Sequence, residues 1–285
     1  MPDSLVSLPG RWHRPGLRRL IALLFLLAAG SPAAAEPALI FGLLPSESVT
    51  TKFRRYAPLR EYLRQRLGRD VVLETARDFR AFRRRTLVGQ YDLLETAPHF
   101  VPEAIDSGRY EVLTTIVEPL TAQIVVRADS AYRQPADLAG ALVATPSPAA
   151  VITRIGKEAL EAAGLIGPAA PRYVSFPTHN AAYAAVLGHA AEAALISVNV
   201  YAKARHQHQP LRSIGSSRPI PNMSMLVARR LPLALRERLQ RVLAGMGAET
   251  EGRRVLREMA YPGYRTATAE EFESLRRYLA PLPPE

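Results

Sequence analysis

Short apolar runs alternate with longer amphipathic stretches along the first third of the chain. Residues 38–44 form an apolar run that ends at a proline, which predicts a buried strand. The next apolar residues recur every three or four positions, which predicts a helix that begins after Ser46 or Ser48 and ends at Gly68. Pro58 falls inside this stretch, so we expect the helix to kink or restart there.

The same alternation continues to residue 108. Apolar runs at 71–73 and 91–95 predict two further strands, and amphipathic stretches that close at Gly89 and Gly108 predict two further helices. Strands and helices in the order β-α-β-α-β imply a mainly parallel sheet with right-handed crossovers.

A second unit of the same kind follows, without a long linker. Its expected strands and helices alternate, and Thr178 stands where it would cap the second helix. The fold class is therefore α/β, with two similar halves. The expected strands cover residues 123–127, 141–144, 172–176 and 193–197, and the expected helices cover residues 148–163 and 179–187.

The first 35 residues have the layout of a cleavable export signal. Four arginines precede an apolar stretch, residues 20–29, that is too short to span a bilayer. Ala33-Ala34-Ala35 then forms a small-residue cleavage site. We expect cleavage near Ala35 and a periplasmic product.

Composition narrows the function classes. The formal net charge of +11 would suggest a nucleic-acid partner in a cytosolic protein, but the predicted export makes nucleic acid a poor partner. The charge instead reflects an arginine-rich composition. We expect Arg83-Arg84-Arg85 to form a solvated helix face. There is no cysteine, so neither a disulfide nor a thiolate metal site is possible. Nucleotide-binding, serine-hydrolase and zinc-protease motifs are absent, and His206-Gln207-His208 is expected in a solvated loop. We therefore expect no enzyme activity, no cofactor and no metal.

Several short motifs occur in an order that resembles the phosphonate- and phosphite-binding branch of the periplasmic solute-binding proteins. The resemblance covers nearly all of residues 38–280. It implies two lobes joined by two crossing strands near Ile124 and Pro221, the first lobe covering 37–125 plus 219–285 and the second 126–218. The motifs are Pro58-Leu59-Arg60-Glu61-Tyr62-Leu63, Leu67-Gly68, Tyr91-Asp92-Leu93-Leu94, Ile124-Val125-Val126-Arg127-Ala128-Asp129-Ser130, Asp137-Leu138-Ala139-Gly140, Thr178-His179-Asn180-Ala181-Ala182 and Ile220-Pro221-Asn222.

The expected ligand site lies where strands lead into helix N-termini, whose free N–H groups favour an anion. Four such loops are readable: 45–49, 95–98, 145–150 and 177–180. By resemblance, His179 is a binding residue, and Thr96, Thr121, Gln123 and Asn199 lie where relatives place polar contacts. The full expected set is Ser46, Ser48, Thr96, Thr121, Gln123, Ser147, Ala149, Ala150, His179 and Asn199.

The loop at 145–151 departs from the family pattern. It keeps Ser147, which can cap a helix that begins at Pro148, but it has apolar side chains where relatives carry hydroxyls. The backbone N–H groups of Ala149 and Ala150 remain available to an anion. Each lost charge-assisted bond costs about 1.5–3 kcal/mol. Either the ligand has fewer oxygens or less charge, or its affinity is low, or other donors compensate; we expect a less charged oxyanion or a carboxylate to bind better than a phosphonate. Glu95 is open to two interpretations, as an arginine partner or as a contact for the positive group of a zwitterion.

These features predict a monomeric periplasmic binding protein that delivers a small anionic ligand to an ABC permease. The alternative is a sensory protein of the same fold that docks on a membrane sensor protein, because the fold does not separate the two functions.

Overall fold

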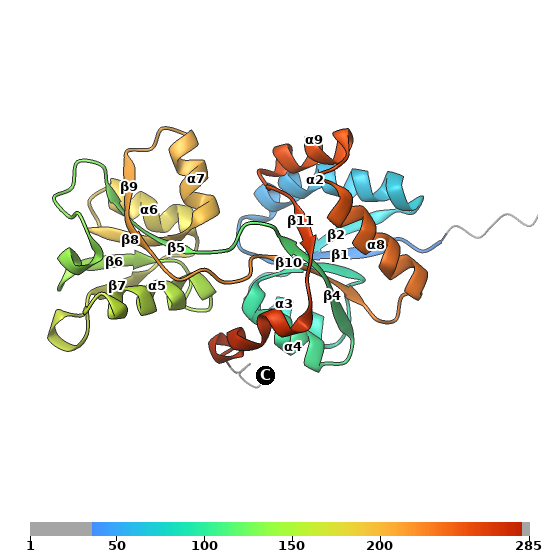
Figure 1. Cartoon of the computed structure of the whole chain (residues 1–285), viewed down its shortest axis with the longest axis horizontal. Coiled ribbons are helices and arrows are strands. Elements are labelled where there is room, and N and C mark those ends of the chain that lie inside the picture. Colours follow the sequence, from blue (N-terminus) through green and yellow to red (C-terminus); the bar gives the residue numbers. More distant parts are fainter. Residues whose placement is uncertain (1–35, 281–285) are drawn as a thin grey trace, which may run out of the picture. The chain divides into compact units, whose positions relative to one another are not determined.

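The computed structural model describes residues 36–280, so the export signal predicted over residues 1–35 lies outside the described range. Within that range the chain forms a six-stranded and a five-stranded β-sheet, each flanked by helices (Figure 1). We call the six-stranded sheet with its helices the first lobe, and the five-stranded sheet with its helices the second lobe. The predicted two-lobed α/β fold is confirmed. Among the described helices, none combines the length and the apolar character that crossing a bilayer requires.

The first sheet has the strand order β11-β4-β10-β3-β1-β2. β1 pairs in parallel with β2 and with β3, as the β-α-β-α-β pattern predicted, and β10 and β11 add antiparallel pairs. The strands are β1 (Leu39–Leu43), β2 (Val71–Thr75), β3 (Leu93–Thr96), β4 (Tyr110–Ile116), β10 (Ser224–Ala228) and β11 (Tyr264–Thr266). The helices are α2 (Val49–Leu67), α3 (Phe79–Leu87), η1 (Pro98–Phe100), α4 (Val101–Asp106), α8 (Leu233–Gly245), α9 (Thr250–Met259) and η4 (Ala269–Tyr278).

Helix α2 shows how local signals and burial combine. Ser48 caps it by accepting a hydrogen bond from the Thr51 amide at 3.3 Å, and Gly68 ends it with a φ of 67°. The helix does not restart at Pro58. A proline inside a helix costs about 3 kcal/mol, whereas each large side chain that the helix buries, such as Tyr56 or Leu59, contributes about 1.5–3 kcal/mol.

The second sheet has the order β7-β6-β8-β5-β9. β6 pairs in parallel with β7 and β8, and β5 and β9 complete the sheet with antiparallel pairs. The strands are β5 (Ala122–Arg127), β6 (Leu142–Thr145), β7 (Arg172–Ser175), β8 (Ala193–Ser197) and β9 (Leu211–Ser216). The helices are η2 (Pro135–Leu138), α5 (Val151–Ala162), η3 (Gly167–Ala169), α6 (His179–Leu187) and α7 (Val198–His206).

Helix α5 begins three residues later than the sequence predicts. Its N-cap is Ala150 rather than Ser147, and no side chain caps it. The Ser147 carbonyl accepts a hydrogen bond from the Ala150 amide at 2.9 Å, and the Ser147 hydroxyl accepts one from the Ala149 amide at 3.3 Å. These bonds close a separate turn before the helix, so the proline does not occupy the first helical position.

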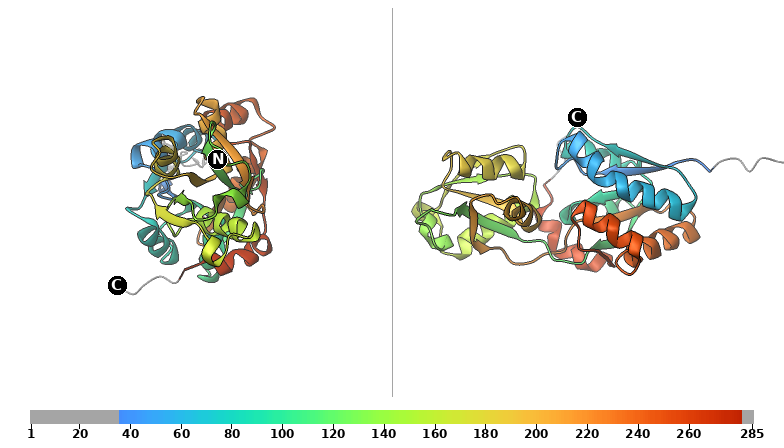
Figure 2. Two further views of the ribbon diagram at one scale, coloured as in Figure 1. Left: turned by 90° about the vertical axis from the view of Figure 1, so that its left-hand side faces the viewer. Right: turned by 90° about the horizontal axis from the view of Figure 1, so that it is seen from above.

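Two chain segments cross between the lobes, one from β4 to β5 and one from β9 to β10 (Figures 1 and 2). They pair through Leu120 and Ile220, whose backbones exchange hydrogen bonds of 2.8 and 3.0 Å. The first crossing therefore lies before Ile124, and all of β5 belongs to the second sheet. Residues 122–125, which the sequence boundaries place in the first lobe, move to the second.

The lobes also share an apolar cluster, which includes the crossing residues Leu120 and Ile220. The first half of α5 places Val151, Ile152 and Ile155 in the same buried cluster as Phe100 and Tyr278 of the first lobe. Because α5 otherwise packs on the second sheet through Leu160, it connects the cores of the two lobes.

The arginine run in α3 is not a uniformly solvated face. Arg83 is buried and forms a two-pronged ion pair with Glu103 of α4, with both N–O distances at 2.8 Å. Its guanidinium also lies 5.2 Å from the centroid of the Phe100 ring. The expectation failed because it considered the helix alone, and α4 packs over this part of it.

Candidate functional site

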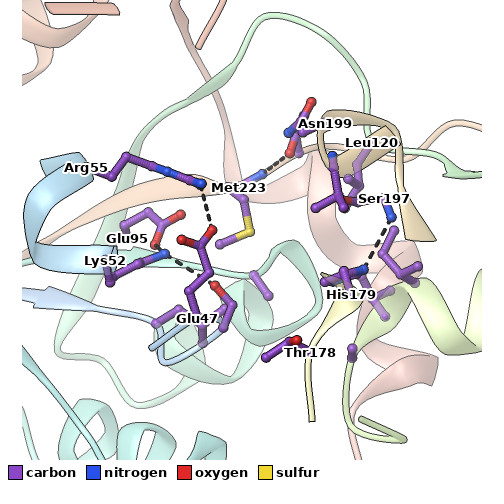
Figure 3. A pocket seen from close by; sticks show the side chains of 18 of the residues that line it. Glu47, Lys52, Arg55, Glu95, Leu120, Thr178, His179, Ser197, Asn199 and Met223 are labelled. Carbon is purple, nitrogen blue, oxygen red and sulfur yellow. Dashed lines mark hydrogen bonds and ion pairs between the residues drawn. The ribbon is translucent and has the colours of Figure 1, made fainter. Parts of the chain in front are cut away.

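A cavity of about 340 Å³ opens where β1, β3, β6, β7 and β8 end (Figure 3). Residues of both lobes line it, and each of the loops 45–49, 95–98, 145–150 and 177–180 contributes. The position follows the general rule for α/β sheets, in which ligands bind beyond the carboxyl ends of strands. The volume falls within the range typical of small-molecule sites.

The wall that the second lobe provides consists of helix N-termini and one cationic side chain, Lys203 in the second turn of α7. Helices α5, α6 and α7 all begin at the cavity. The first N–H groups of any helix lack intrahelical partners and carry partial positive charge. Thr178 and Ser197 each cap one of these helices through a side-chain oxygen, but α5 has no side-chain cap.

The backbone closes the start of α5 instead, because the Thr153 amide donates to the Ala150 carbonyl at 3.1 Å. The amides of Ala149 and Ala150, predicted to be available to an anion, both donate to Ser147, so that prediction is wrong.

His179 stands at the start of α6 and adds a side-chain donor to this wall. Its Nδ1 accepts a hydrogen bond from the Ser197 amide at 3.3 Å, so the proton of the neutral ring resides on Nε2. Burial lowers the pKa of His179 to about 4, and the ring is therefore neutral at neutral pH. His179 offers an N–H donor without a positive charge.

The wall that the first lobe provides is built from ion pairs. Lys52 lies 3.0 Å from Glu95, and these side chains are only 3% and 2% exposed. Arg55 lies 2.7 Å from Glu47, with both side chains about one-quarter exposed. In each pair one carboxylate oxygen, Oε1 of Glu95 and Oε2 of Glu47, is buried without a hydrogen-bond partner in the described part of the chain.

Two buried tyrosine hydroxyls lie beside these ion pairs. Tyr261 lines the cavity, and its hydroxyl lies 2.7 Å from the hydroxyl of Tyr56. Burial, and then the charge of Glu95, raise the pKa of both hydroxyls well above the usual value, so both remain neutral phenols. The Lys52 ammonium also lies 5.0 Å from the centroid of the Tyr56 ring.

His99 joins the two walls. It belongs to the first lobe, and its Nε2 lies 3.0 Å from the carbonyl oxygen of Ala149 in the second. Nδ1 is buried without a partner among the described residues. Burial lowers the pKa of His99 to about 3, so the ring is neutral and donates from Nε2 to the carbonyl.

Half of the residues predicted from the sequence line the cavity. They are Ser46, Ser48, Ala150, His179 and Asn199.

Thr96, Thr121, Gln123, Ser147 and Ala149 do not line it. Thr96 is buried beside β10, opposite Ser224. Gln123 donates to the Thr121 hydroxyl at 3.0 Å and accepts from the Ser213 hydroxyl at 2.9 Å. The Ser147 hydroxyl is used in its own turn, and the Ala149 carbonyl binds His99. Except for the Thr96 hydroxyl, which is buried without a partner among the described residues, these groups bond within the fold instead of facing the cavity.

The cavity also contains charged residues that the predicted set omits. Glu47, Lys52 and Arg55 come from the loop before α2 and from its first two turns, and Tyr261 follows α9. The three-residue spacing of Lys52 and Arg55 places both on one helix face, which is a readable signal. That this face meets a cavity depends on β3 and α9, which lie far along the chain.

Comparison with known proteins agrees with this geometry. The sequence model of one family, described as the periplasmic substrate-binding protein of phosphonate ABC transporters, matches residues 41–272. No curated protein matches the chain.

Solved structures share the fold at low sequence identity. A protein from Prochlorococcus marinus in complex with methylphosphonate has a TM-score of 0.74 and 13% identity, over 85% of this chain and 96% of that one. A binding component of an ABC phosphonate transporter from Pseudomonas aeruginosa has a TM-score of 0.71 and 16% identity, over 85% of each chain. A Xanthomonas citri protein bound to chloride ion has a TM-score of 0.68 and 16% identity, over 85% and 99%. The fold is that of type II periplasmic binding proteins.

Proposed function

Because this chain belongs to the family of periplasmic substrate-binding proteins of phosphonate ABC transporters, we propose that it captures a small organic anion in the cavity between its lobes. The family consists of transport proteins that bind small anions and work with an ABC permease. In our proposal the protein acts as a monomer, without catalysis and without nucleic acid, after cleavage near Ala35 has removed the export signal.

The observation that carries the ligand proposal is the convergence of three helix N-termini with the neutral donor His179. An anion placed there receives backbone N–H groups and one imidazole N–H. Both cationic side chains of the opposite wall, Lys52 and Arg55, are already paired with carboxylates. The second-lobe wall adds one cation, Lys203 of α7, which lines the cavity without a carboxylate partner among the described residues. A site with a single uncompensated positive charge favours a monoanion over a phosphonate dianion.

Closure of the lobes would couple binding to transport. The ligand binds more tightly where both walls contact it, so it shifts the population toward the closed form. The permease then distinguishes the loaded protein from the empty one by its shape.

Calorimetry with three anions of matched chain length tests the ligand class. We expect propanesulfonate and butyrate to bind more tightly than propylphosphonate at pH 9.5, where the phosphonate is mostly a dianion. Submicromolar binding of propylphosphonate alone would show that backbone donors replace the missing hydroxyls of the 145–151 loop. Failure of all three anions to bind would remove the proposed function. Mass spectrometry of the exported protein tests cleavage near Ala35.

A further inference from the structure

Three arginines gather at the end of the first lobe that points away from the cavity. Strand β4 leads into one crossing segment and β10 follows the other, so the start of β4 and the end of β10 lie at this far end (Figure 1). Arg109 precedes β4, and Arg229 and Arg230 follow β10. The amide of Arg229 donates to the carbonyl of Arg109 at 2.8 Å, so these residues are direct neighbours. We call Arg109, Arg229 and Arg230 the arginine cluster.

Main-chain carbonyls hold the side chains of the arginine cluster. The acceptors are Leu87 for Arg109 at 3.0 Å, Tyr110 for Arg229 at 3.1 Å and Gly89 for Arg230 at 2.6 Å. Arg230 also pairs with Asp92 at 2.8 Å, but Arg109 and Arg229 have no carboxylate partner among the described residues. Because a carbonyl carries no net charge, these bonds fix the guanidinium groups without neutralising them.

Two exposed apolar side chains lie beside the arginine cluster. Val88, which is 69% exposed, lies between the two residues whose carbonyls bind Arg109 and Arg230. Leu233, which is 59% exposed, begins α8 three residues after Arg230. The far end of the first lobe therefore presents apolar side chains that are surrounded by fixed positive charge.

A structural role accounts for only part of this arrangement. Arg109 and Arg230 bond carbonyls at the end of α3, where a cation also stabilises the helix dipole. Each carbonyl bond uses one of the five N–H groups of a guanidinium, so most of the donors remain available. Capping of α3 explains neither Arg229 nor the exposed apolar side chains.

The chemistry of the arginine cluster fits the surface of an anionic bilayer. The family places the chain in the periplasm, where phospholipid headgroups form an extended anionic surface. A guanidinium binds a phosphate through two N–H groups at once. Apolar side chains among basic ones are typical of proteins that bind at a membrane interface. A small anion from solution would contact the arginines but would leave Val88 and Leu233 in water.

We propose that the far end of the first lobe binds reversibly to an anionic phospholipid bilayer. The arginine cluster binds the lipid phosphates, and Val88 and Leu233 enter the headgroup layer. None of these residues lines the cavity, so this binding does not depend on which anion the cavity holds. Its effect is to keep the protein at the membrane that contains the permease.

Vesicle co-sedimentation of the exported protein at low ionic strength tests this proposal. We expect binding to phosphatidylglycerol vesicles and none to phosphatidylcholine vesicles. Arg109→Gln/Arg229→Gln should raise the lipid concentration at half-binding roughly twenty-fivefold, because each arginine contributes a factor of about five. Val88→Asp should raise it severalfold, because a carboxylate does not enter an anionic headgroup layer. Val88 is exposed, so this second variant tests the surface without removing a hydrogen bond of the fold.

Arg172→Gln/Arg205→Gln is the matched control. Both side chains are exposed on the second lobe, and neither has a carboxylate partner among the described residues. The substitutions change the net charge by the same amount as those in the arginine cluster. They should shift half-binding by less than about twofold. Urea unfolding of both double variants checks that the fold remains intact.

Three results would overturn the proposal. The first is no binding to phosphatidylglycerol vesicles, in which case an acidic protein surface is the next partner to test. The second is an equal loss in the cluster variant and its control, because net charge alone would then explain the binding. The third is unchanged binding in Val88→Asp. Since no variant alters a residue that lines the cavity, each of these results leaves the proposed function standing.

Discussion

The two walls of the cavity achieve polarity by different means. The first-lobe wall uses charged side chains, Lys52 with Glu95 and Arg55 with Glu47, that neutralise each other. The second-lobe wall uses backbone N–H groups, the uncharged His179 and one lysine, Lys203, that has no carboxylate partner among the described residues. The buried Lys52–Glu95 pair depends on a contact between distant segments, whereas helix N-termini are properties of local chain geometry. The first wall therefore ties ligand recognition to the stability of its lobe, and the second wall does so much less.

The largest expected effect comes from breaking the buried ion pair of the first wall. Lys52→Met leaves the Glu95 carboxylate buried without its cation, and the loss of one partner of such a pair costs about 3–5 kcal/mol. Urea unfolding should show this as a lower free energy of unfolding. The double variant Lys52→Met/Glu95→Gln should recover more than half of the loss.

Arg64→Met is the matched control for this substitution. Arg64 lies on the same helix and pairs with Glu61, but both side chains are more than 40% exposed. Its loss should cost less than about 1 kcal/mol. Similar losses in Lys52→Met and Arg64→Met would contradict the view that the first wall is a stabilising element of its lobe.

The difference between the walls also explains what the sequence could predict. The start of α6 at His179 follows from the capping Thr178 and the apolar pattern after it, and the predicted range 179–187 is the observed helix. Ala150 lies in a strand-to-helix loop that the local pattern predicts, although its helix begins three residues later than expected. Asn199 lies in α7, a helix that the sequence analysis does not predict, and its selection rested on the family resemblance. Neighbouring residues alone therefore predicted the start of α6, but not the whole of the second wall.

The first wall was less accessible because it depends on register. Glu95 pairs with Leu43 in the parallel ladder and faces the cavity, whereas Thr96, one residue later, points to the other side of the sheet. A sequence pattern identifies the end of a strand but not which of two adjacent residues meets α2. The role of Tyr261 depends on the packing of α9 against α2, about 200 residues apart in the chain, and no local pattern indicates it.

The second-largest expected effect is the pH dependence of stability that comes from His99, the residue that joins the two walls. The pKa of His99 is lowered from 6.5 to about 3 by burial, so the unfolded chain takes up this proton near pH 6.5 while the folded protein does not. The stability linked to His99 is complete above pH 6.5 and is lost as the pH falls toward 3. Between pH 7 and pH 4.5 this group should account for roughly 2–3 kcal/mol.

His99→Gln checks this assignment by urea unfolding at several pH values. Glutamine keeps an N–H donor for the Ala149 carbonyl but does not titrate. The variant should lose less stability on acidification than the wild-type protein, by about the amount assigned to His99. The pKa of His179 is lowered to about 4, so His179 also contributes stability that is lost as the pH falls from 6.5 to 4. This contribution is the same in the wild-type protein and in His99→Gln. Parallel stability curves for the two proteins would show that His99 titrates normally.

The third effect concerns ligand affinity at the second wall. His179→Ala removes the Nε2 donor and should weaken binding of the tightest anion from the panel by about 1–3 kcal/mol, measured by calorimetry. Because the ring is already neutral, wild-type affinity should not change between pH 6 and 8 through this residue. Unchanged affinity in His179→Ala would remove His179 from the site, and the helix N-termini alone would then hold the anion.

The smallest effect is expected from a contact that joins the lobes away from both walls. The Tyr278 hydroxyl, at the end of η4, donates to Glu158 of α5 at 2.7 Å and accepts from Arg218 at 2.6 Å. Tyr278→Phe should cost about 0.5–1.5 kcal/mol of contact between the lobes. If this arrangement of the lobes is the one that binds ligand, affinity should fall roughly two- to tenfold, although Tyr278 does not line the cavity.

Tyr201→Phe is the matched control for Tyr278→Phe. The Tyr201 hydroxyl accepts a hydrogen bond from the Ser213 amide at 2.9 Å, and both residues belong to the second lobe. Its loss should lower stability by a similar amount but leave ligand affinity unchanged, because no contact between the lobes is lost. Equal affinity in both variants would mean that the Tyr278 contact is present whether or not ligand is bound. Recognition would then depend on the two walls alone, and the energy of closure would have to come from the ligand itself.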